Sequence, residues 1–208
     1  MNKPFHDKSD EQRDDRKVVR IEQKSPAQSD EQLWESFRKG KESAFVQIYN
    51  QHFRILYNYG YQLSGNSDLI KDCIQEVFIH IRKKRSKLPK VTSIKAYLLH
   101  CVRNKLITEL KKLKKNEQID LEDLPFNFNT TPSHENVLIN RQLNDNQIKK
   151  VHDSLSQLSD RKKEAIYYFY YNNLDYNQIK EIMEFGSVKA ARNLIYRALT
   201  ELRKNILK

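Results

Sequence analysis

The segment DYNQIKEIMEFGSVKAARNLIYRALTELRKNIL, residues 175–207, decides the fold of the C-terminal part of this 208-residue chain. Its apolar residues recur at helical spacing on both sides of an interruption, Glu184-Phe185-Gly186. We therefore expect a short helix over about residues 176–183 and a long one over about residues 187–207, with Asp175 and Ser187 as N-caps. A short and a long helix joined by such a turn are typical of a DNA-binding helix-turn-helix.

The long helix expected over residues 187–207 has two distinct faces. Its apolar stripe should pack on the preceding helices. In helix-turn-helix motifs, the early residues of the second helix meet base edges in the major groove, where Arg pairs with guanine and Asn with adenine. The candidate DNA-binding residues of this helix are therefore Ser187, Lys189, Arg192, Asn193, Tyr196 and Arg197. An ordinary amphipathic helix with a basic surface is the alternative interpretation.

Upstream of this segment, the same helical periodicity recurs. It predicts a short first helix, which starts near Ser29 and ends at Gly40, and longer helices over about residues 43–63, 68–84, 94–115, 137–158 and 159–171. Residues 116–136 crowd Pro, Asn and Thr together, and residues 1–28 contain few large apolar side chains. We expect an all-α fold of two small helical domains, 29–115 and 137–208, joined by a flexible linker, 116–136, and preceded by a disordered tail, 1–28.

Positive charge is concentrated in one part of the chain. The net charge is +11, and the segment from Arg82 to Lys115 contains thirteen Lys or Arg residues against a single acid, Glu109. Such a run is either a solvated face or the footprint of a nucleic acid. The candidate nucleic-acid site comprises Lys87, Lys90, Thr92, Ser93, Lys95, His100, Arg103, Asn104, Lys111 and Lys112. Aromatic side chains for base stacking are few nearby, so the electrostatic signal is the stronger one.

The helix expected over residues 68–84 has a different polar side. Asp72 and Glu76 are one turn apart and share a face, and Gln75 and Ile79 also lie away from the apolar stripe. This side is either simply solvated or a docking face for a protein partner, with Ile79 as an exposed apolar anchor.

Other function classes are disfavoured by what the sequence lacks. Cys73 and Cys101 stand far apart in apolar helical positions, so we expect reduced core thiols and neither a disulfide scaffold nor a zinc pair. The histidines do not form metal-ligand pairs with nearby acids, and no phosphate-binding loop, nucleophile elbow or HExxH motif occurs. No long apolar run or secretory signal is present. We expect a cytoplasmic protein that is no enzyme, nucleases included, with no metal, no cofactor, no small-molecule substrate and no membrane insertion.

Several short motifs follow one another at characteristic spacing. They are Leu33-Trp34-Glu35-Ser36-Phe37-Arg38-Lys39-Gly40, Asp72-Cys73-Ile74-Gln75-Glu76-Val77-Phe78, Ala96-Tyr97-Leu98 with Val102-Arg103-Asn104, and Asn193-Leu194-Ile195-Tyr196-Arg197-Ala198-Leu199. Together they resemble the extracytoplasmic-function (ECF) sigma factors, most of all the group common in Bacteroidetes, over residues 33–204. No single motif is decisive, but their order and spacing are specific.

The resemblance implies an RNA polymerase sigma factor, which directs core polymerase to specific promoters and initiates DNA melting. The first domain would bind the β′ clamp helices through Asp72, Gln75 and Glu76. It would also recognise the −10 element and capture the melted strand through Arg103, Asn104 and the loop over residues 87–93. The second domain would read the −35 element and contact the β flap. An anti-sigma factor is a further partner that the resemblance implies.

Two positions of the helix-turn-helix depart from the family pattern. Lys180 replaces a small residue of the first helix, and Glu184 replaces the usual glycine of the turn. Both bear on the geometry of the turn and so on which base edges are reached.

Two other functions stay open at this point. A free-standing helix-turn-helix repressor or activator would account for the second domain, and such regulators usually dimerise on a palindrome. A non-specific basic nucleic-acid protein would show a steep salt dependence without promoter preference.

Overall fold

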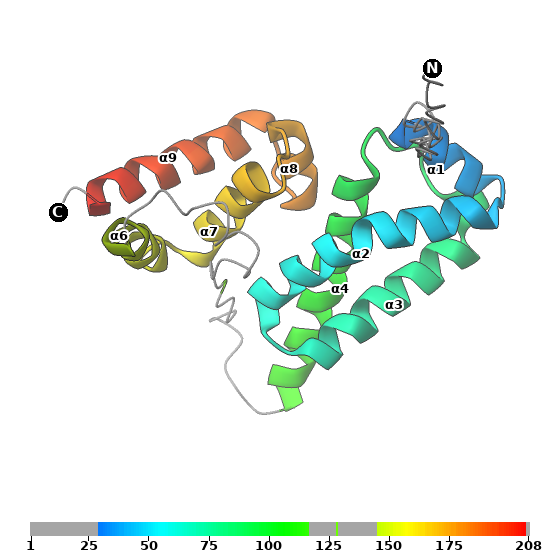
Figure 1. Cartoon of the computed structure of the whole chain (residues 1–208), viewed down its shortest axis with the longest axis horizontal. Helices are drawn as coiled ribbons and strands as arrows, with labels where there is room; N and C mark the ends of the chain where they lie inside the picture. Colours follow the sequence, from blue (N-terminus) through cyan, green and yellow to red (C-terminus); the bar gives the residue numbers. More distant parts are fainter. Residues whose placement is uncertain (1–28, 117–127, 129–144, 207–208) are drawn as a thin grey trace, which may run out of the picture.

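The computed structural model describes residues 29–116, 128 and 145–206, and the regular elements among them are helices (Figure 1). An N-terminal group contains α1 (Asp30–Arg38), α2 (Glu42–Ser64), α3 (Ser67–Lys83), the 3₁₀ turn η1 (Arg85–Lys87) and α4 (Ile94–Asn116). A C-terminal group contains α6 (Asp145–Ser156), α7 (Asp160–Ile166), the π-helical turn η2 (Tyr167–Tyr171), α8 (Tyr176–Ile182) and α9 (Val188–Ile206). The predicted all-α fold is confirmed. None of the helices in these ranges is long and apolar enough to cross a membrane.

The helix ends agree closely with the expected ones, with one difference inside the segment 159–171. This segment is α-helical only to Ile166 and then continues as η2, where the Asn172 N–H donates to the Tyr167 carbonyl, five residues back, at 3.2 Å. The tail 1–28, residues 137–144 and the linker apart from Asn116 and Phe128 lie outside the described residues.

Local signals in the sequence account for several of these boundaries. The Ser29 hydroxyl accepts a hydrogen bond from the Gln32 N–H at 3.3 Å, which caps α1. Gly40 follows α1 at a φ of +90°, a conformation that favours glycine. Gly60 has another role, because a Cβ there would lie 2.7 Å from the Cγ2 of Ile70. Its missing side chain lets α2 and α3 approach closely.

The N-terminal group is built on α2, α3 and α4, which pack against one another, with α1 laid against α2. Trp34 of α1 is only 1% exposed, and its indole N–H donates to the Pro89 carbonyl at 2.8 Å. The Asp30 carboxylate accepts from the Ile94 N–H, also at 2.8 Å. These two bonds tie both ends of the loop before α4 to α1, and so hold the basic loop in place.

The two groups are packed together. Helix α4 contacts α8, and Tyr59, Phe128 and Tyr168 are buried between the groups within one continuous apolar cluster. The Phe128 ring centroid lies 6.2 Å from that of Tyr59 and 5.3 Å from that of Tyr167. The sequence predicted two bodies on a flexible tether. In this conformation they share a core, while the domain boundaries stay a prediction.

Candidate protein and nucleic-acid interfaces

Helices α8 and α9 are the short and the long helix expected from residues 175–207, and their role as a DNA-binding helix-turn-helix stays a prediction. Helix α8 begins with a reciprocal capping box, in which Asp175 and Gln178 each accept from the backbone N–H of the other. The Ser187 hydroxyl accepts from the Ala190 N–H at 3.2 Å and caps α9. Glu184 adopts a φ of +56°, so the turn keeps the left-handed conformation that glycine usually provides. The departure at Glu184 thus leaves the turn intact.

The predicted base-reading side of α9 faces solvent. Ala191, Ile195 and Ala198 form its buried side, whereas the side chains of Lys189, Arg192, Asn193, Tyr196 and Arg197 are exposed. Tyr196 is 71% exposed. The Arg192 guanidinium lies 5.3 Å from the centroid of the Tyr176 ring, a cation–π contact that restricts it without covering it. The structure therefore brings these candidates together on one open surface, with the capping residue Ser187 at its end.

The predicted docking residues also share an open surface. Asp72, Gln75, Glu76 and Ile79 are all exposed on α3, opposite its buried side. Glu76 pairs with Lys105 of α4 at 2.6 Å, and Ile79 is 44% exposed. An exposed isoleucine between acids and an amide is the composition expected of a surface that binds protein.

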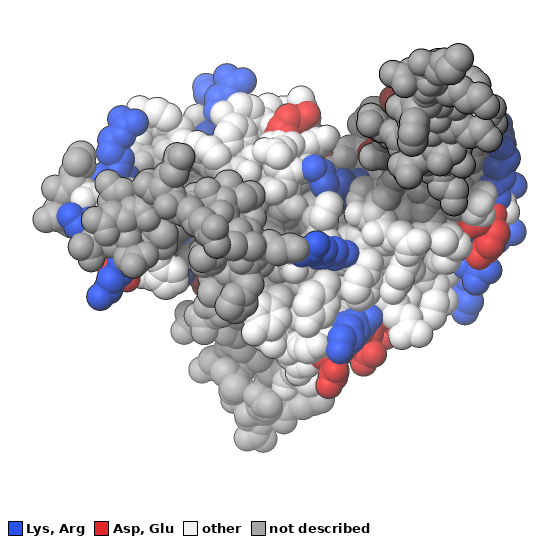
Figure 2. Space-filling model, viewed as in Figure 1, with Lys and Arg blue, Asp and Glu red and all other residues white. Residues whose placement is uncertain are grey.

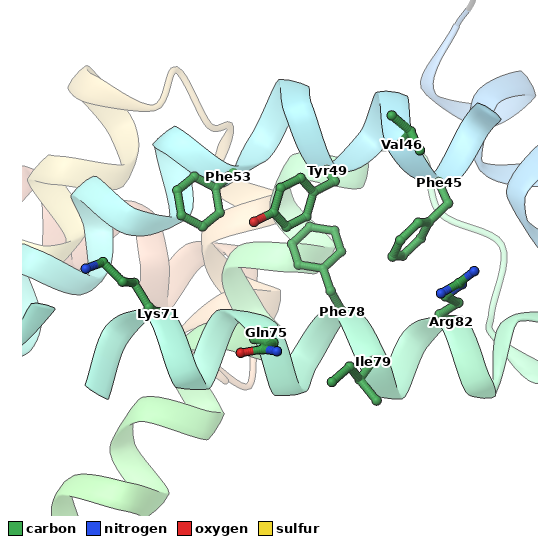
Figure 3. A pocket seen from close by; sticks show the side chains of 9 residues that line it. All are labelled: Phe45, Val46, Tyr49, Phe53, Lys71, Gln75, Phe78, Ile79 and Arg82. Carbon is green, nitrogen blue, oxygen red and sulfur yellow. The ribbon is translucent and has the colours of Figure 1, made fainter. Parts of the chain in front are cut away.

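An apolar groove of about 520 Å³ lies beside this surface, between α2 and α3 (Figure 3). We call it the α2–α3 groove. Its residues are Phe45, Val46, Tyr49 and Phe53 of α2 and Lys71, Gln75, Phe78, Ile79 and Arg82 of α3. The Arg82 guanidinium closes one end, where it lies 5.2 Å from the Phe45 ring centroid and pairs with Glu42 at 2.7 Å.

Sequence reasoning missed this groove, because it used the apolar residues of this segment only to predict a helix over about residues 43–63. The missed signal was a run of aromatic residues four apart, Phe45, Tyr49, Phe53, Tyr57 and Tyr61, together with Val46 off the stripe. The buried residues in this part of α2 are instead Ala44, Ile48, His52 and Leu56 on the neighbouring positions. The helix thus has more apolar surface than its own group can bury.

The candidate nucleic-acid site, which runs from Lys87 to Lys112 and which we call the basic strip, is exposed at its two ends and covered in its middle. Lys87, Lys90 and Thr92 of the loop are exposed, as are Lys111 and Lys112 near the end of α4. Ser93 is partly buried, and its hydroxyl accepts from the Ala96 N–H and caps α4. Figure 2 shows Lys and Arg side chains gathered at the right-hand edge of the molecule, where α1 and α3 end.

The middle of the strip is covered by the C-terminal group. The Lys95 ammonium donates to the Asn172 carbonyl at 2.5 Å, and the Asn104 amide donates to the Glu184 carboxylate at 3.2 Å. His100 is partly buried beside Asn104, 3.2 Å from its amide nitrogen. Arg103 donates to both carboxylate oxygens of Glu164, at 2.8 and 3.3 Å. An open groove along α4 was expected, and in this conformation these side chains contact protein.

Glu164 is the centre of a buried polar network. Its carboxylate accepts from the Tyr59 hydroxyl at 2.7 Å and from the Tyr168 hydroxyl at 3.1 Å, in addition to Arg103. Burial raises the pKa of Tyr59 well above its ordinary value, and the nearby Glu164 charge raises it further. Burial lowers the pKa of Arg103, but the Glu164 carboxylate more than offsets this, so that the pKa is raised. Arg103 and Glu164 therefore form a buried ion pair, with Nε and Oε1 2.8 Å apart.

Burial raises the pKa of both cysteine thiols. The pKa of Cys73 is raised to about 11, which leaves the thiol a protonated core group. Both cysteines are free. Across the part of the chain that the structure describes, no three His, Cys, Asp or Glu side chains gather to hold a metal ion.

Comparisons with known proteins agree with this geometry. The family described as Sigma-70 region 2 matches residues 48–116, which span most of α2, all of α3 and α4. A comparison with curated proteins finds no match. The structure is similar to the sigma factor RpoE from Bartonella quintana, solved with the anti-sigma factor NepR, at 17% identity and a TM-score of 0.55, covering 78% of this chain and 96% of RpoE.

A second solved structure has the same arrangement of helices. CnrH, solved with the cytosolic domain of CnrY, is 16% identical with a TM-score of 0.53, covering 83% of this chain and 93% of CnrH. At such identities the likeness establishes the fold. Residues 48–116 of the N-terminal group therefore match Sigma-70 region 2, in a chain whose fold is similar to that of the sigma factor RpoE.

Proposed function

We propose that this chain is an RNA polymerase sigma factor of the ECF type, which directs core polymerase to specific promoters and initiates DNA melting. The observation that carries the proposal is the region 2 match over residues 48–116, because the same helices carry the exposed docking residues and the basic strip. A sigma factor contributes recognition and not catalysis. The finer assignment to the group common in Bacteroidetes rests on the motif resemblance alone.

The α3 surface and the α2–α3 groove are the proposed polymerase contact. Asp72, Gln75 and Glu76 would bind the β′ clamp helices, and Ile79 lies at the border between this polar surface and the groove. The groove is apolar over most of its length, so it suits the apolar side of a helix. A partner helix could thus bury its apolar side in the groove and place its basic side against Asp72 and Glu76.

The exposed side of α9 is the proposed reader of the −35 element, and the C-terminal group would also contact the β flap. Arg192 and Asn193 have the chemistry to read base edges, and Lys189, Tyr196 and Arg197 to contact phosphates. The basic loop and α4 would bind the −10 element and the melted strand, once the contacts with the C-terminal group are released. We also propose that the protein acts in the cytoplasm.

An anti-sigma factor is a further proposed partner. RpoE and CnrH were each solved in complex with a second protein, the anti-sigma factor NepR and the cytosolic domain of CnrY respectively. The exposed apolar residues of the α2–α3 groove support a competition, in which such a partner excludes polymerase from the same surface.

The test is in vitro transcription with core polymerase, followed by mapping of start sites on a genomic template library. Start sites that share −10 and −35 elements only when this chain is present are the expected result. A repressor would instead bind duplex DNA tightly without polymerase. A non-specific protein would bind all sequences with the same salt dependence. Either behaviour contradicts the proposal.

A further inference from the structure

We propose that the chain carries an internal latch that closes the C-terminal group over the −10 side of α4 and so inhibits DNA binding until polymerase has bound. The inference rests on the proposed function and adds its regulation. We call the buried network of Tyr59, Arg103, Glu164 and Tyr168, with Phe128 packed beside it, the latch.

The latch is built from both groups. Tyr59 of α2 and Arg103 of α4 belong to the N-terminal group, whereas Glu164 of α7 and Tyr168 of η2 belong to the C-terminal group. The Glu164 side chain is 4% exposed and that of Arg103 is 14% exposed. A carboxylate this deeply buried needs a cation and further donors close by. Among the described residues, the cation that pairs with Glu164 is Arg103 of the N-terminal group, so the buried charge favours the closed arrangement.

Phe128 adds an apolar component from the linker. Its ring is 1% exposed between Tyr59 and Tyr167, and its backbone N–H donates to the Asp160 carboxylate at 3.3 Å. Phe128 itself is therefore held at the boundary between the two groups. Separation of the groups would expose this ring and leave the Glu164 charge to be solvated.

In the closed state, the C-terminal group contacts residues that are assigned to binding of the −10 element. Arg103 donates through Nε and Nη2 to Glu164 and its side chain is only 14% exposed, which leaves little of it open to a phosphate. Lys95 and Asn104 donate to Asn172 and Glu184 of the same C-terminal group. By contrast, Ile79 on the docking surface and Tyr196 on α9 stay exposed. Polymerase docking and −35 contact can thus occur first, and strand capture requires the latch to open.

The test compares Glu164→Gln with Phe128→Ala. Glu164→Gln removes the charge that holds Arg103, and Phe128→Ala weakens the latch without touching its polar network. Neither residue belongs to the proposed DNA-binding or polymerase-binding sites. The matched control is Glu201→Gln, because Glu201 pairs with Lys162 inside the C-terminal group. Circular dichroism on each variant establishes that the helices are retained.

The first readout is the distance between the groups. Spin labels attached through Asn50→Cys and Gln157→Cys, two exposed positions in the two groups, are introduced into the full chain with Cys73→Ala and Cys101→Ala. The unaltered latch and Glu201→Gln should give one short, narrow distance distribution, and both latch variants a longer and broader one. A broad distribution in the chain with an intact latch overturns the proposal.

The second readout is promoter-complex formation with core polymerase. The apparent affinity for the promoter is reduced in proportion to the fraction of molecules whose latch is open. The latch variants should therefore reach half-saturation at about tenfold lower concentration of the chain. Variants that open but bind promoter no better show that closure does not inhibit. If no form of the chain binds polymerase, the proposed function fails, and the distance measurement still decides whether the latch exists.

Discussion

Helices α9 and α4 were both expected to present basic, DNA-binding surfaces, yet the structure treats them differently. The polar side of α9 is open, with Arg192 and Tyr196 in solvent. The middle of the polar side of α4 is covered, with Arg103 in a buried ion pair. The difference teaches that helical periodicity identifies the polar side of a helix. It does not tell whether the polar side chains there contact water or another part of the chain. Substitutions on the exposed surfaces of α3 and α9 should therefore change binding. Substitutions on the covered side of α4 should also change the free energy of unfolding.

The largest effect is expected on the open surface of α3. Charge reversal by Asp72→Lys together with Glu76→Lys should weaken polymerase binding by about 100-fold or more, because cations of the partner would meet cations. Affinity is measured by titration of core polymerase with labelled chain, and the free energy of unfolding should stay nearly unchanged. The matched control reverses Glu31 and Asp153, which are exposed acids elsewhere. Equal loss in both double variants would mean that net charge, and not a docking surface, matters.

Substitution on the covered surface of α4 should lower the free energy of unfolding. Replacement of Arg103 by Met leaves the Glu164 carboxylate buried without its cation, which should lower the free energy of unfolding by about 3 kcal/mol in urea denaturation. Replacement of Arg192 by Met on the open surface should change it by less than about 0.5 kcal/mol. Similar small losses in both variants would show that the two groups separate freely, and the contrast between the helices would disappear.

Substitution on the exposed side of α9 should reduce discrimination between DNA sequences. Arg192→Ala should reduce the preference for the promoter over a scrambled −35 element by about 1–3 kcal/mol, as for a lost base contact. Competition binding of the holoenzyme to both DNAs measures this. A uniform loss on both sequences would assign Arg192 to a phosphate instead.

The smallest effect concerns His52, which is 8% exposed on α2. Burial lowers its pKa below 6.5, whereas nearby Asp30 raises it and Lys95 lowers it. Since the unfolded chain binds the proton more readily, stability should fall as the pH drops below 6.5 and level off below the folded-state pKa. Urea denaturation from pH 7.5 to pH 5 checks this, and His52→Gln should flatten the curve. An unchanged pH dependence in that variant would assign it to other groups.

Much of the local structure could be predicted because its causes are local. The caps at Ser29, Asp175 and Ser187, and the end of α1 at Gly40, depend on residues three or four positions apart. The exposed candidates on α3 and α9 follow from helical periodicity. The α2–α3 groove was missed for a related reason. Periodicity shows that Phe45 and Tyr49 share a side of α2, but not whether enough neighbouring surface exists to cover them.

The amino-acid sequence by itself determined the helices, their caps, the turn between α8 and α9 and the concentration of positive charge, since these depend on neighbours along the chain. Only the tertiary structure decided which charges stay open. Tyr59 and Glu164 are 105 residues apart, and their hydrogen bond forms only when two helical groups and Phe128 meet. Burial of a charge depends on everything that surrounds it, and a linear pattern does not contain those surroundings.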